Sequence, residues 1–237
     1  MKKAGDSRAS DGAVTELWLL HLADSALPIG AFAHSFGVET LIAAELLDVG
    51  DLEKFLRAWL EESGVVEAVF CRTAFRIAQS TEFPVREWIA INDRFSAMKP
   101  ARESRKASTL LGTNFLRSAL AVCDLRRLTR TASFQDDLPV HHACAFGLVC
   151  GALNLDEDGA ARAYLHQSLG GLISACQRLM PLGQTRAQQI LWNLKPSMVE
   201  AAQSSSEATT DDVSGFLPML DWGSMEHPEL LTRLFIS

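Results

Sequence analysis

Apolar residues recur every three or four positions along almost the whole chain of 237 residues. This spacing places them on one face of an α-helix. In residues 51–60, for example, one face is marked by Leu52, Phe55, Leu56 and Trp59. Strict alternation of apolar and polar residues, which indicates a half-buried strand, is not found. The sequence therefore predicts an all-α fold, a helical bundle in a single domain of ordinary length.

Proline, glycine and acidic residues divide this pattern into separate helices. The pattern of residues 51–60 resumes after Gly64, which predicts one long or bent helix. Further boundaries are expected at Pro84, at Lys99-Pro100, near Ala101, at Pro139 in the first turn of an apolar helix containing residues 141–153, at the acidic start Asp156-Glu157-Asp158, and at Pro181. Gly183 can supply a positive φ for the turn that follows.

Composition limits the classes of function. The longest apolar run, residues 143–153, is shorter than the roughly 20 residues that a membrane-spanning helix needs. The first 14 residues have no hydrophobic secretion core. A formal net charge of −7 disfavours nucleic acid as a partner. We therefore expect a cytoplasmic protein that binds neither membrane nor nucleic acid.

The two ends of the chain differ in character from its middle. Residues 1–13 are rich in Lys, Ser, Asp and Gly and are predicted to be a disordered leader before the domain of residues 14–201. Residues 202–215 have the composition of a flexible linker. Residues 216–237 form an apolar tail, which must be buried either on its own domain or on another protein.

Five cysteines lie within apolar helical patterns, and none forms a Cys-x-x-Cys pair. Buried, reduced thiols that pack as small hydrophobic groups are the favoured interpretation over disulfides or metal ligands. The residues are Cys71, Cys123, Cys144, Cys150 and Cys176.

The segment from Asp24 to Glu39 places Pro28, Gly30 and Gly37 between two helical runs. Proline removes a backbone donor, and glycine adopts backbone angles that other residues avoid. These residues predict a rigid, shaped loop. Such a loop is either a structural corner or a place where another molecule docks.

No catalytic or nucleotide-binding pattern is present. The chain has no phosphate-binding loop and no nucleophile elbow. Ser35 follows His34, but adjacent side chains at a helix start point apart, which disfavours a nucleophile and base. His141 and Cys144 have a spacing that two metal ligands can use, but no third ligand is near, and packing is preferred. His34 and His227, on predicted turns, remain possible transient ligands.

Several motifs occur in one order along residues 15–237. They are Asp24–Glu39, Glu103–Ser108 with Gly112, His141 with Phe146-Gly147, Pro181–Gln184, Pro218–Asp221, Ser224–His227 and Arg233–Phe235. Together these motifs resemble the UreF family of urease accessory proteins. Departures are Ala143, where the family often has Pro, and Ile236, where a basic residue is common.

This resemblance implies a non-catalytic helical protein that assists nickel delivery to urease. Family members form homodimers, bind the accessory protein UreD (also called UreH), and recruit the GTPase UreG onto apo-urease. We accordingly expect no catalytic residue, no tightly bound cofactor or metal, and nickel handled by the complex. The residues expected to bind partners or shape loops are Asp24, Pro28, Gly30, Phe32, His34, Ser35, Glu39, Glu103, Arg105, Ser108, His141, Gly183, Gln184, Arg233 and Phe235.

Two interpretations of the Glu103 region stay open. Glu103 favours the helix dipole and is spaced to pair with Lys106, so the turn is either solvated or part of a cluster that holds the Asp24–Glu39 loop. The resemblance favours the cluster, which Gln184 could join. A GTPase regulator acts either by supplying a cation, such as Arg105 or Arg233, or by conformational control, which we favour.

Two other classes of function are considered. One is a metallochaperone that carries nickel through His34, His141 or His227. The other is a helical enzyme, which is disfavoured because no convergent set of acid and base residues is visible.

Overall fold

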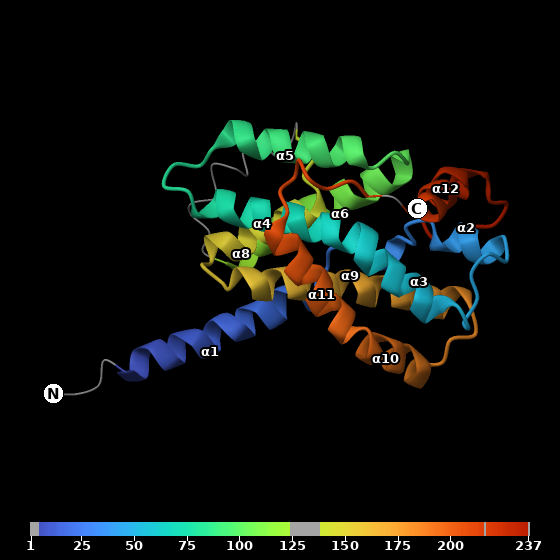
Figure 1. The fold of residues 1–237 in the computed structure, drawn as a ribbon, viewed down its shortest axis with the longest axis horizontal. Coiled ribbons are helices and arrows are strands. Elements are labelled where there is room, and N and C mark those ends of the chain that lie inside the picture. The colour runs from blue at the N-terminus through green and yellow to red at the C-terminus, as the bar shows by residue number, and fades with distance from the viewer. Residues whose placement is uncertain (1–4, 124–137, 216, 237) are drawn as a thin grey trace.

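The computed structural model describes residues 5–123, 138–215 and 217–236, and every regular element within these ranges is helical (Figure 1). This confirms the predicted all-α class. The elements are α1 (Gly5–Leu22), the 3₁₀ turn η1 (Ala31–Ala33), α2 (Val38–Ala43), α3 (Leu52–Trp59), the π turn η2 (Leu60–Gly64), α4 (Val65–Gln79), α5 (Val85–Met98), α6 (Arg102–Val122), α8 (His142–Ala152), α9 (Glu157–Leu179), α10 (Gln184–Asn193), α11 (Lys195–Glu207), α12 (Pro218–Glu226) and the 3₁₀ turn η3 (His227–Glu229).

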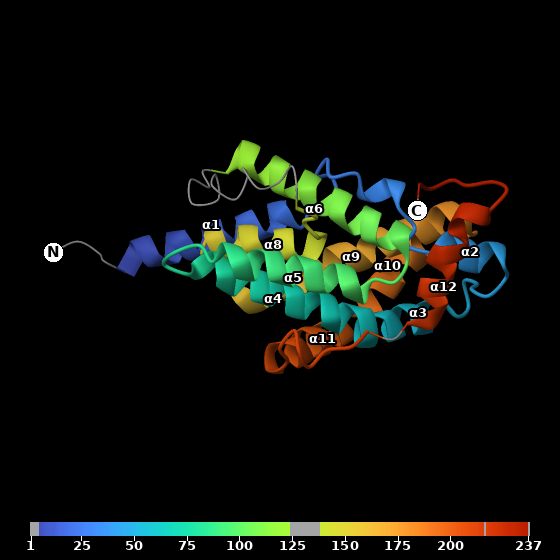
Figure 2. The ribbon, with the colours of Figure 1, turned by 90° about the horizontal axis from the view of Figure 1, so that it is seen from above.

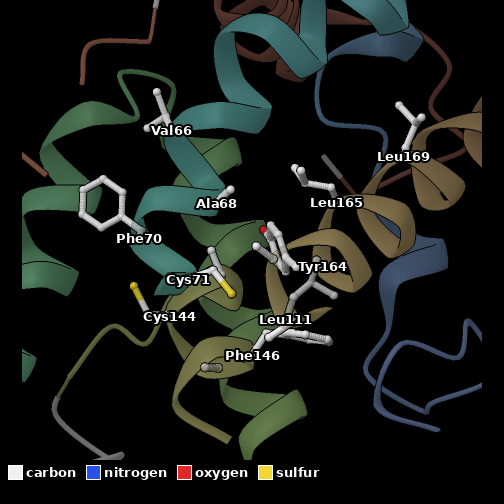
Figure 3. Close-up of a cluster of buried hydrophobic side chains, with 14 of the residues drawn as sticks. Val66, Ala68, Phe70, Cys71, Leu111, Cys144, Phe146, Tyr164, Leu165 and Leu169 are labelled. Carbon is white, nitrogen blue, oxygen red and sulfur yellow. The ribbon is translucent and has the colours of Figure 1, made fainter. Parts of the chain in front are cut away.

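Helix α8 is the centre of the bundle. It packs mainly against α4 and α6, and every residue from His142 to Gly151 is buried. A helix that is apolar on all sides has no face for solvent, so the most hydrophobic run of the chain is surrounded by the others. Figure 3 shows the core beside it, where Phe146 of α8 lies near Leu111 of α6 and Tyr164 of α9.

The crossing of α4 and α8 requires two glycines. A Cβ atom on Gly147 would lie 1.8 Å from the carbonyl oxygen of Cys71, and one on Gly151 would lie 2.3 Å from that of Phe75. Real Cβ atoms do not approach so closely, so these positions admit no side chain without separating the helices.

The helix predicted to be long or bent is a continuous unit of α3, η2 and α4. The backbone at both junctions, Leu60 and Val65, is helical. A π turn inserts an extra residue into the helical repeat and is a common cause of a bend. Gly64 ends this turn against α9, where a Cβ atom would lie 3.3 Å from the side chain of Leu165.

Most predicted boundaries agree with the structure. Helix α5 begins directly after Pro84, and α9 ends before Pro181. Asp156 caps the start of α9, since its carboxylate accepts a hydrogen bond from the N–H of Gly159 at 2.6 Å. One boundary was wrong: α8 begins at His142, so Pro139 precedes the helix instead of lying in its first turn.

Two segments predicted to lack regular structure are helical. Helix α1 begins at Gly5, inside the predicted leader of residues 1–13. Helix α11 continues to Glu207, through the first part of the predicted linker, because one face of this polar segment packs on α4 and α9. There Arg72 of α4 donates hydrogen bonds to the carbonyl of Ala202 and the hydroxyl of Ser205, both at 2.9 Å.

Part of the apolar tail packs on its own domain, as one of the two alternatives left open by the sequence requires. Helix α12 contacts α2 and α6, and Leu220, His227 and Phe235 are buried. The C-terminal segment lies beside α2 at one end of the molecule, whereas α1 extends from the opposite end (Figures 1 and 2). None of the helices described is both long and apolar enough to cross a membrane.

Candidate functional site

The segment of residues 24–39 is a loop whose shape is fixed by hydrogen bonds at both ends of its first half. Oδ1 of Asp24 accepts a hydrogen bond from the N–H of Ala26 at 2.8 Å. The carbonyl of Ile29, which is buried, accepts one from Nδ2 of Asn114 on α6 at 3.0 Å. The loop is therefore attached to α6, and it does not extend freely into solvent.

The turn η1, within this loop, carries an aromatic side chain that is exposed to solvent. Pro28 leads into Gly30, whose φ of +86° is in the left-handed region that favours glycine. Phe32 follows on η1, and 53% of its surface is exposed. A large ring held in solvent by an ordered turn is a feature expected of a docking residue.

At the end of the loop, its backbone lies in direct contact with the backbone of the tail. Gly37 has a φ of +89°, and a Cβ atom there would lie 2.6 Å from the carbonyl oxygen of Leu220 on α12. Conversely, a Cβ atom on Gly223 would lie 2.6 Å from the carbonyl oxygen of Gly37. Paired glycines thus allow α12 to approach the start of α2.

Three ionisable side chains from distant parts of the chain meet at this contact. The ring of His227 is fully buried, with Nε2 2.8 Å from Oε2 of Glu39 and Nδ1 2.7 Å from Oε2 of Glu103. The ring therefore lies between two carboxyl groups, each within hydrogen-bond distance of one of its nitrogens. These contacts join α2, α6 and the tail.

Glu39 also holds the last residues of the tail. Its Oε1 accepts the N–H of Leu234 at 2.6 Å, and its Oε2 accepts the N–H of Phe235 at 3.2 Å. The N–H of Ile236 donates to the carbonyl of Ala33 at 2.9 Å. A single buried carboxylate therefore fixes both His227 and the extended end of the chain.

Arg178 of α9 contacts both the loop and the tail. Its Nη1 donates to the carbonyl of Phe32 at 2.5 Å, and its guanidinium lies 4.3 Å from the centre of the Phe235 ring. An Arg over an aromatic face is an attractive cation–π arrangement. The side chain thus supports the exposed turn and the buried tail anchor together.

The loop and tail, held in this way, leave large apolar side chains exposed. We refer to this set as the loop–tail surface. Its members are Phe32, Trp222, Met225, Leu231, Leu234 and Ile236, which are 42–103% exposed. Apolar side chains gathered on ordered, linked segments are typical of a protein-docking surface, so this surface is the candidate functional site.

Ser108 and His141 lie in the core beside α8, away from the loop–tail surface. Nδ1 of His141 is 2.9 Å from Oγ of Ser108, and Nε2 is 2.7 Å from Oγ of Ser96. Burial lowers the pKa of His141 to about 3, helped by the nearby charges of Lys99 and Arg105. The neutral ring therefore packs where α5, α6 and the start of α8 meet, with serine hydroxyls as its partners instead of the expected backbone carbonyls.

Arg105 and Glu103 do not act as one cluster. Nη1 of Arg105 donates to the carbonyls of Lys99 and Pro100 at 2.5 and 2.8 Å, so it secures the start of its own helix. Glu103 points to His227, and no ion pair with Lys106 is found in the described part of the chain. Of the charged residues at this helix start, Glu103 is the one that contacts the tail, and Arg105 does not take part.

The remaining predicted residues are dispersed. Gly183 has a φ of −67°, so the expected positive φ is not used, and Gln184 accepts a hydrogen bond from Gln177 at 2.8 Å instead of joining Glu103. Arg233 is exposed near the end of the tail. His34 and Ser35 are buried in the loop, and burial lowers the pKa of His34.

The chemistry of these groups does not favour catalysis. A histidine with a pKa of about 3 is a poor base at neutral pH, although Ser108 is within reach of His141. Within the ranges that the structure describes, no three His, Cys, Asp or Glu side chains are placed to hold a metal ion. All five cysteines are free, and burial raises the pKa of each thiol.

Sequence reasoning missed several residues that shape the site. Gly223 and Arg178 had no local signal, because their roles depend on contacts between distant segments. Ser104 was quoted only as part of a motif, yet its hydroxyl donates to that of Ser224 at 2.8 Å and links α6 with α12. Gly37 was expected to shape the loop, but its close contact with α12 could not be predicted from the sequence.

Comparison with known proteins gives one consistent family. The family model UreF matches residues 46–195. The urease accessory protein UreF of Corynebacterium glutamicum (strain R) is 30% identical over 226 residues, which cover 92% of this chain and 96% of that protein. The protein of the same name from Bradyrhizobium diazoefficiens is 30% identical over 236 residues, covering 99% and 96%, and that from Microcystis aeruginosa is 31% identical over 226 residues, covering 93% and 97%.

Proposed function

The chain belongs to the UreF family of urease accessory proteins, and from that premise we propose that it is a non-catalytic scaffold for urease maturation. In this role the protein presents the loop–tail surface to a second accessory protein of the UreD (UreH) type. The resulting complex positions the GTPase UreG on apo-urease and controls its activity. Nickel is the cargo of the assembly, and the chain works as a homodimer.

The observation that carries this proposal is the position of Glu39. Its carboxylate binds His227 and two backbone N–H groups of the tail, so a single buried residue at the end of the loop orders the tail half of the loop–tail surface. A surface that is ordered before binding loses less conformational entropy when a partner docks. Phe32 and Trp222 are the aromatic anchors that such a surface would use.

Control of UreG is proposed to be conformational. Arg105 is engaged with two backbone carbonyls of its own helix, an arrangement that suits a structural role better than contact with a phosphate. Arg233 is exposed, so it is the arginine that could reach a partner's nucleotide. Replacing each by Lys and measuring GTP hydrolysis by UreG separates these mechanisms. Loss of turnover by Arg233→Lys with binding intact would favour an arginine supplied in trans.

The alternative of a nickel-carrying metallochaperone has weaker support. Both ring nitrogens of His141 face serine hydroxyls, and both of His227 face carboxylates, so neither ring offers a lone pair without breaking a buried hydrogen bond. Equilibrium dialysis of the isolated protein with micromolar nickel tests this alternative. Tight stoichiometric binding would favour it over a pure scaffold.

The decisive experiment for the scaffold is reconstitution of urease activation with the complete set of maturation proteins. We expect activation to need this chain and to fall at least tenfold with Phe32→Ser, because an exposed anchor is lost while the fold is kept. Co-purification of the UreD-type protein with the variant should fall in parallel.

Trp192→Ser is the matched control. Trp192 is 68% exposed on α10, against 53% for Phe32, and it does not belong to the loop–tail surface. It should leave activation and co-purification unchanged. Full activation without this chain would contradict the accessory role, and equal loss in both variants would contradict the assignment of the surface.

A further inference from the structure

A cavity of about 120 Å³ lies beneath α12. We refer to it as the α12 cavity. Leu220, Asp221 and Ser224 of α12 form one wall. The other walls come from the 24–39 loop, the junction of α3 with η2, Lys99, and the helices α4, α6, α8 and α9. Its volume is close to that of an engineered cavity of about 150 Å³ that binds benzene, but its lining is not purely apolar.

Two polar atoms at this cavity have no protein partner. Nε2 of His142 and Oε1 of Gln167 are buried, and neither has a hydrogen bond within the described residues. The His142 ring lies between Phe115 and Tyr164, with ring centres 5.6 and 5.3 Å away, so it cannot turn to find another partner without disturbing the core. Leaving such atoms without a hydrogen bond destabilises the folded protein.

Two charged groups at the cavity compensate each other, and a third group, the half-buried carboxyl of Asp221, has its pKa raised by burial. Nζ of Lys99 is 2.8 Å from Oε1 of Glu67, and the hydroxyl of Tyr164 donates to Oε2 of Glu67 at 2.7 Å. Figure 3 shows Tyr164 on α9 at the point where the side chains of α4 and α9 meet. Burial lowers the pKa of His142 to about 4, so this ring is neutral near pH 7. Because the ion pair cancels its own charge and the His142 ring is neutral, these groups favour an uncharged polar molecule in the cavity.

We propose that the α12 cavity is an internal water site, in which ordered water donates to Oε1 of Gln167 and bonds Nε2 of His142. Water occupies roughly 30 Å³ in the liquid, so the cavity has room for several molecules. Buried polar groups without protein partners are commonly satisfied in this way. The serine hydroxyls of Ser63, Ser108 and Ser168 complete a lining with which such water can bond.

Water in the α12 cavity affects which contacts hold α12 on the bundle. The side of α12 that faces the bundle is partly in contact with water. Separating α12 from the bundle therefore exposes less new apolar surface to solvent than separating α8 does. The hydrogen bonds of Glu39 and Glu103 therefore carry a larger share of tail attachment than they would over a dry core. The α12 amides should exchange with solvent faster than those of α8.

Two adjacent glycines of α9 provide the test. A Cβ atom on either Gly170 or Gly171 meets nothing within 4 Å, but only Gly171 lines the cavity. Leucine has a higher helix propensity than glycine at either position. In Gly170→Leu this effect acts alone and should raise Tm by about 2–4 °C. Gly171→Leu should instead lower Tm by at least about 4 °C, because it displaces the water that satisfies His142 and Gln167.

Direct observation of water distinguishes displacement from simple strain. Ordered water within hydrogen-bond distance of His142 Nε2 is expected in a high-resolution crystal structure of the unmodified chain and of Gly170→Leu, and its loss in Gly171→Leu. A dry cavity would give the opposite stability result, since apolar filling then adds packing. Gly171→Leu as stable as Gly170→Leu, or no water at His142 in the unmodified chain, would overturn the proposal.

Discussion

Oε2 of Glu39 lies 2.8 Å from Nε2 of His227, although 188 residues separate the two in the chain. Both side chains are almost fully buried, and Glu103 approaches the same ring from its other nitrogen. The contact connects the loop that follows α1 with the tail that follows α12. It therefore determines whether the loop–tail surface exists as one unit.

Replacing Glu39 by Gln should release the tail. In either orientation of the amide, an oxygen that accepts a hydrogen bond becomes an N–H₂ group that faces a donor, which should lower the free energy of unfolding by about 1–3 kcal/mol. Urea unfolding measures the loss, and limited proteolysis should cleave the tail sooner. Asp211→Asn, which removes the exposed ion pair with Arg94, is the control and should change stability by less than about 1 kcal/mol. Equal effects in both variants would show that Glu39 is not an anchor.

Gly37→Ala should separate the loop from α12 more than Gly30→Ala does. Both glycines have a positive φ, but a Cβ atom on Gly30 meets only Nδ2 of Asn114 at 3.8 Å, whereas one on Gly37 would clash with Leu220. We expect Gly30→Ala to lower stability by about 1 kcal/mol and Gly37→Ala by at least about twice that. Thermal or urea unfolding of the pair measures the difference. Similar losses would mean that the close approach to α12 adds nothing.

Stability should fall steeply in acid because of two buried histidines. Burial lowers the pKa of His141 to about 3 and that of His142 to about 4. In the unfolded chain both rings bind protons below about pH 6.5, while the folded rings stay neutral, so acid favours unfolding. Each ring should contribute up to about 1.4 kcal/mol per pH unit, with full stability above pH 6.5 and progressive loss toward pH 4. Urea unfolding between pH 7 and 5 measures this slope, which His142→Gln should reduce; parallel curves would contradict the assignment.

The ion pair of Lys99 and Glu67 should tolerate joint replacement better than loss of one partner. Lys99→Met leaves the Glu67 carboxylate with only the Tyr164 hydroxyl and should cost about 2–4 kcal/mol. Adding Glu67→Gln removes the uncompensated charge and should restore part of that loss. Chemical unfolding of the single and double variants measures the coupling. A double variant no more stable than Lys99→Met would show that the charge itself is well solvated.

Truncation after Gly215 should abolish binding to the UreD-type protein while most of the helical signal remains. The deletion removes α12 and the tail members of the loop–tail surface, including Trp222, but leaves Phe32 and helices α1 to α11. A pull-down measures binding, and far-UV circular dichroism confirms that the remainder is folded. Tight binding by the truncated chain would place the partner elsewhere.

The helices were predictable because their signals are local. Apolar spacing, Pro84, Pro181 and the Asp156 cap each act within one or two turns. The polar end of α11 was not predictable, since only its contact with Arg72 of α4 shows why it stays helical. Tertiary packing overrides composition at such positions.

The candidate site was predictable only in part. The glycines and proline of the 24–39 loop gave its shape, and the motifs gave Glu39 and Glu103 as residues of interest. Their meeting at His227 could not be read from spacing, because each lies on a different element. The role of Arg178 could not be predicted from the sequence, since an Arg on an exposed helix face is ordinary.

The opposite placement of the two chain ends has a practical consequence for every binding assay above. An affinity tag or fluorophore fused ahead of α1 would sit at the far end of the molecule from the loop–tail surface (Figure 2). The same fusion after Ile236 would emerge next to Phe32, because the Ile236 N–H is bonded to Ala33. Immobilisation through the amino-terminal side should therefore leave capture of partners intact, whereas attachment at the other terminus should mask it.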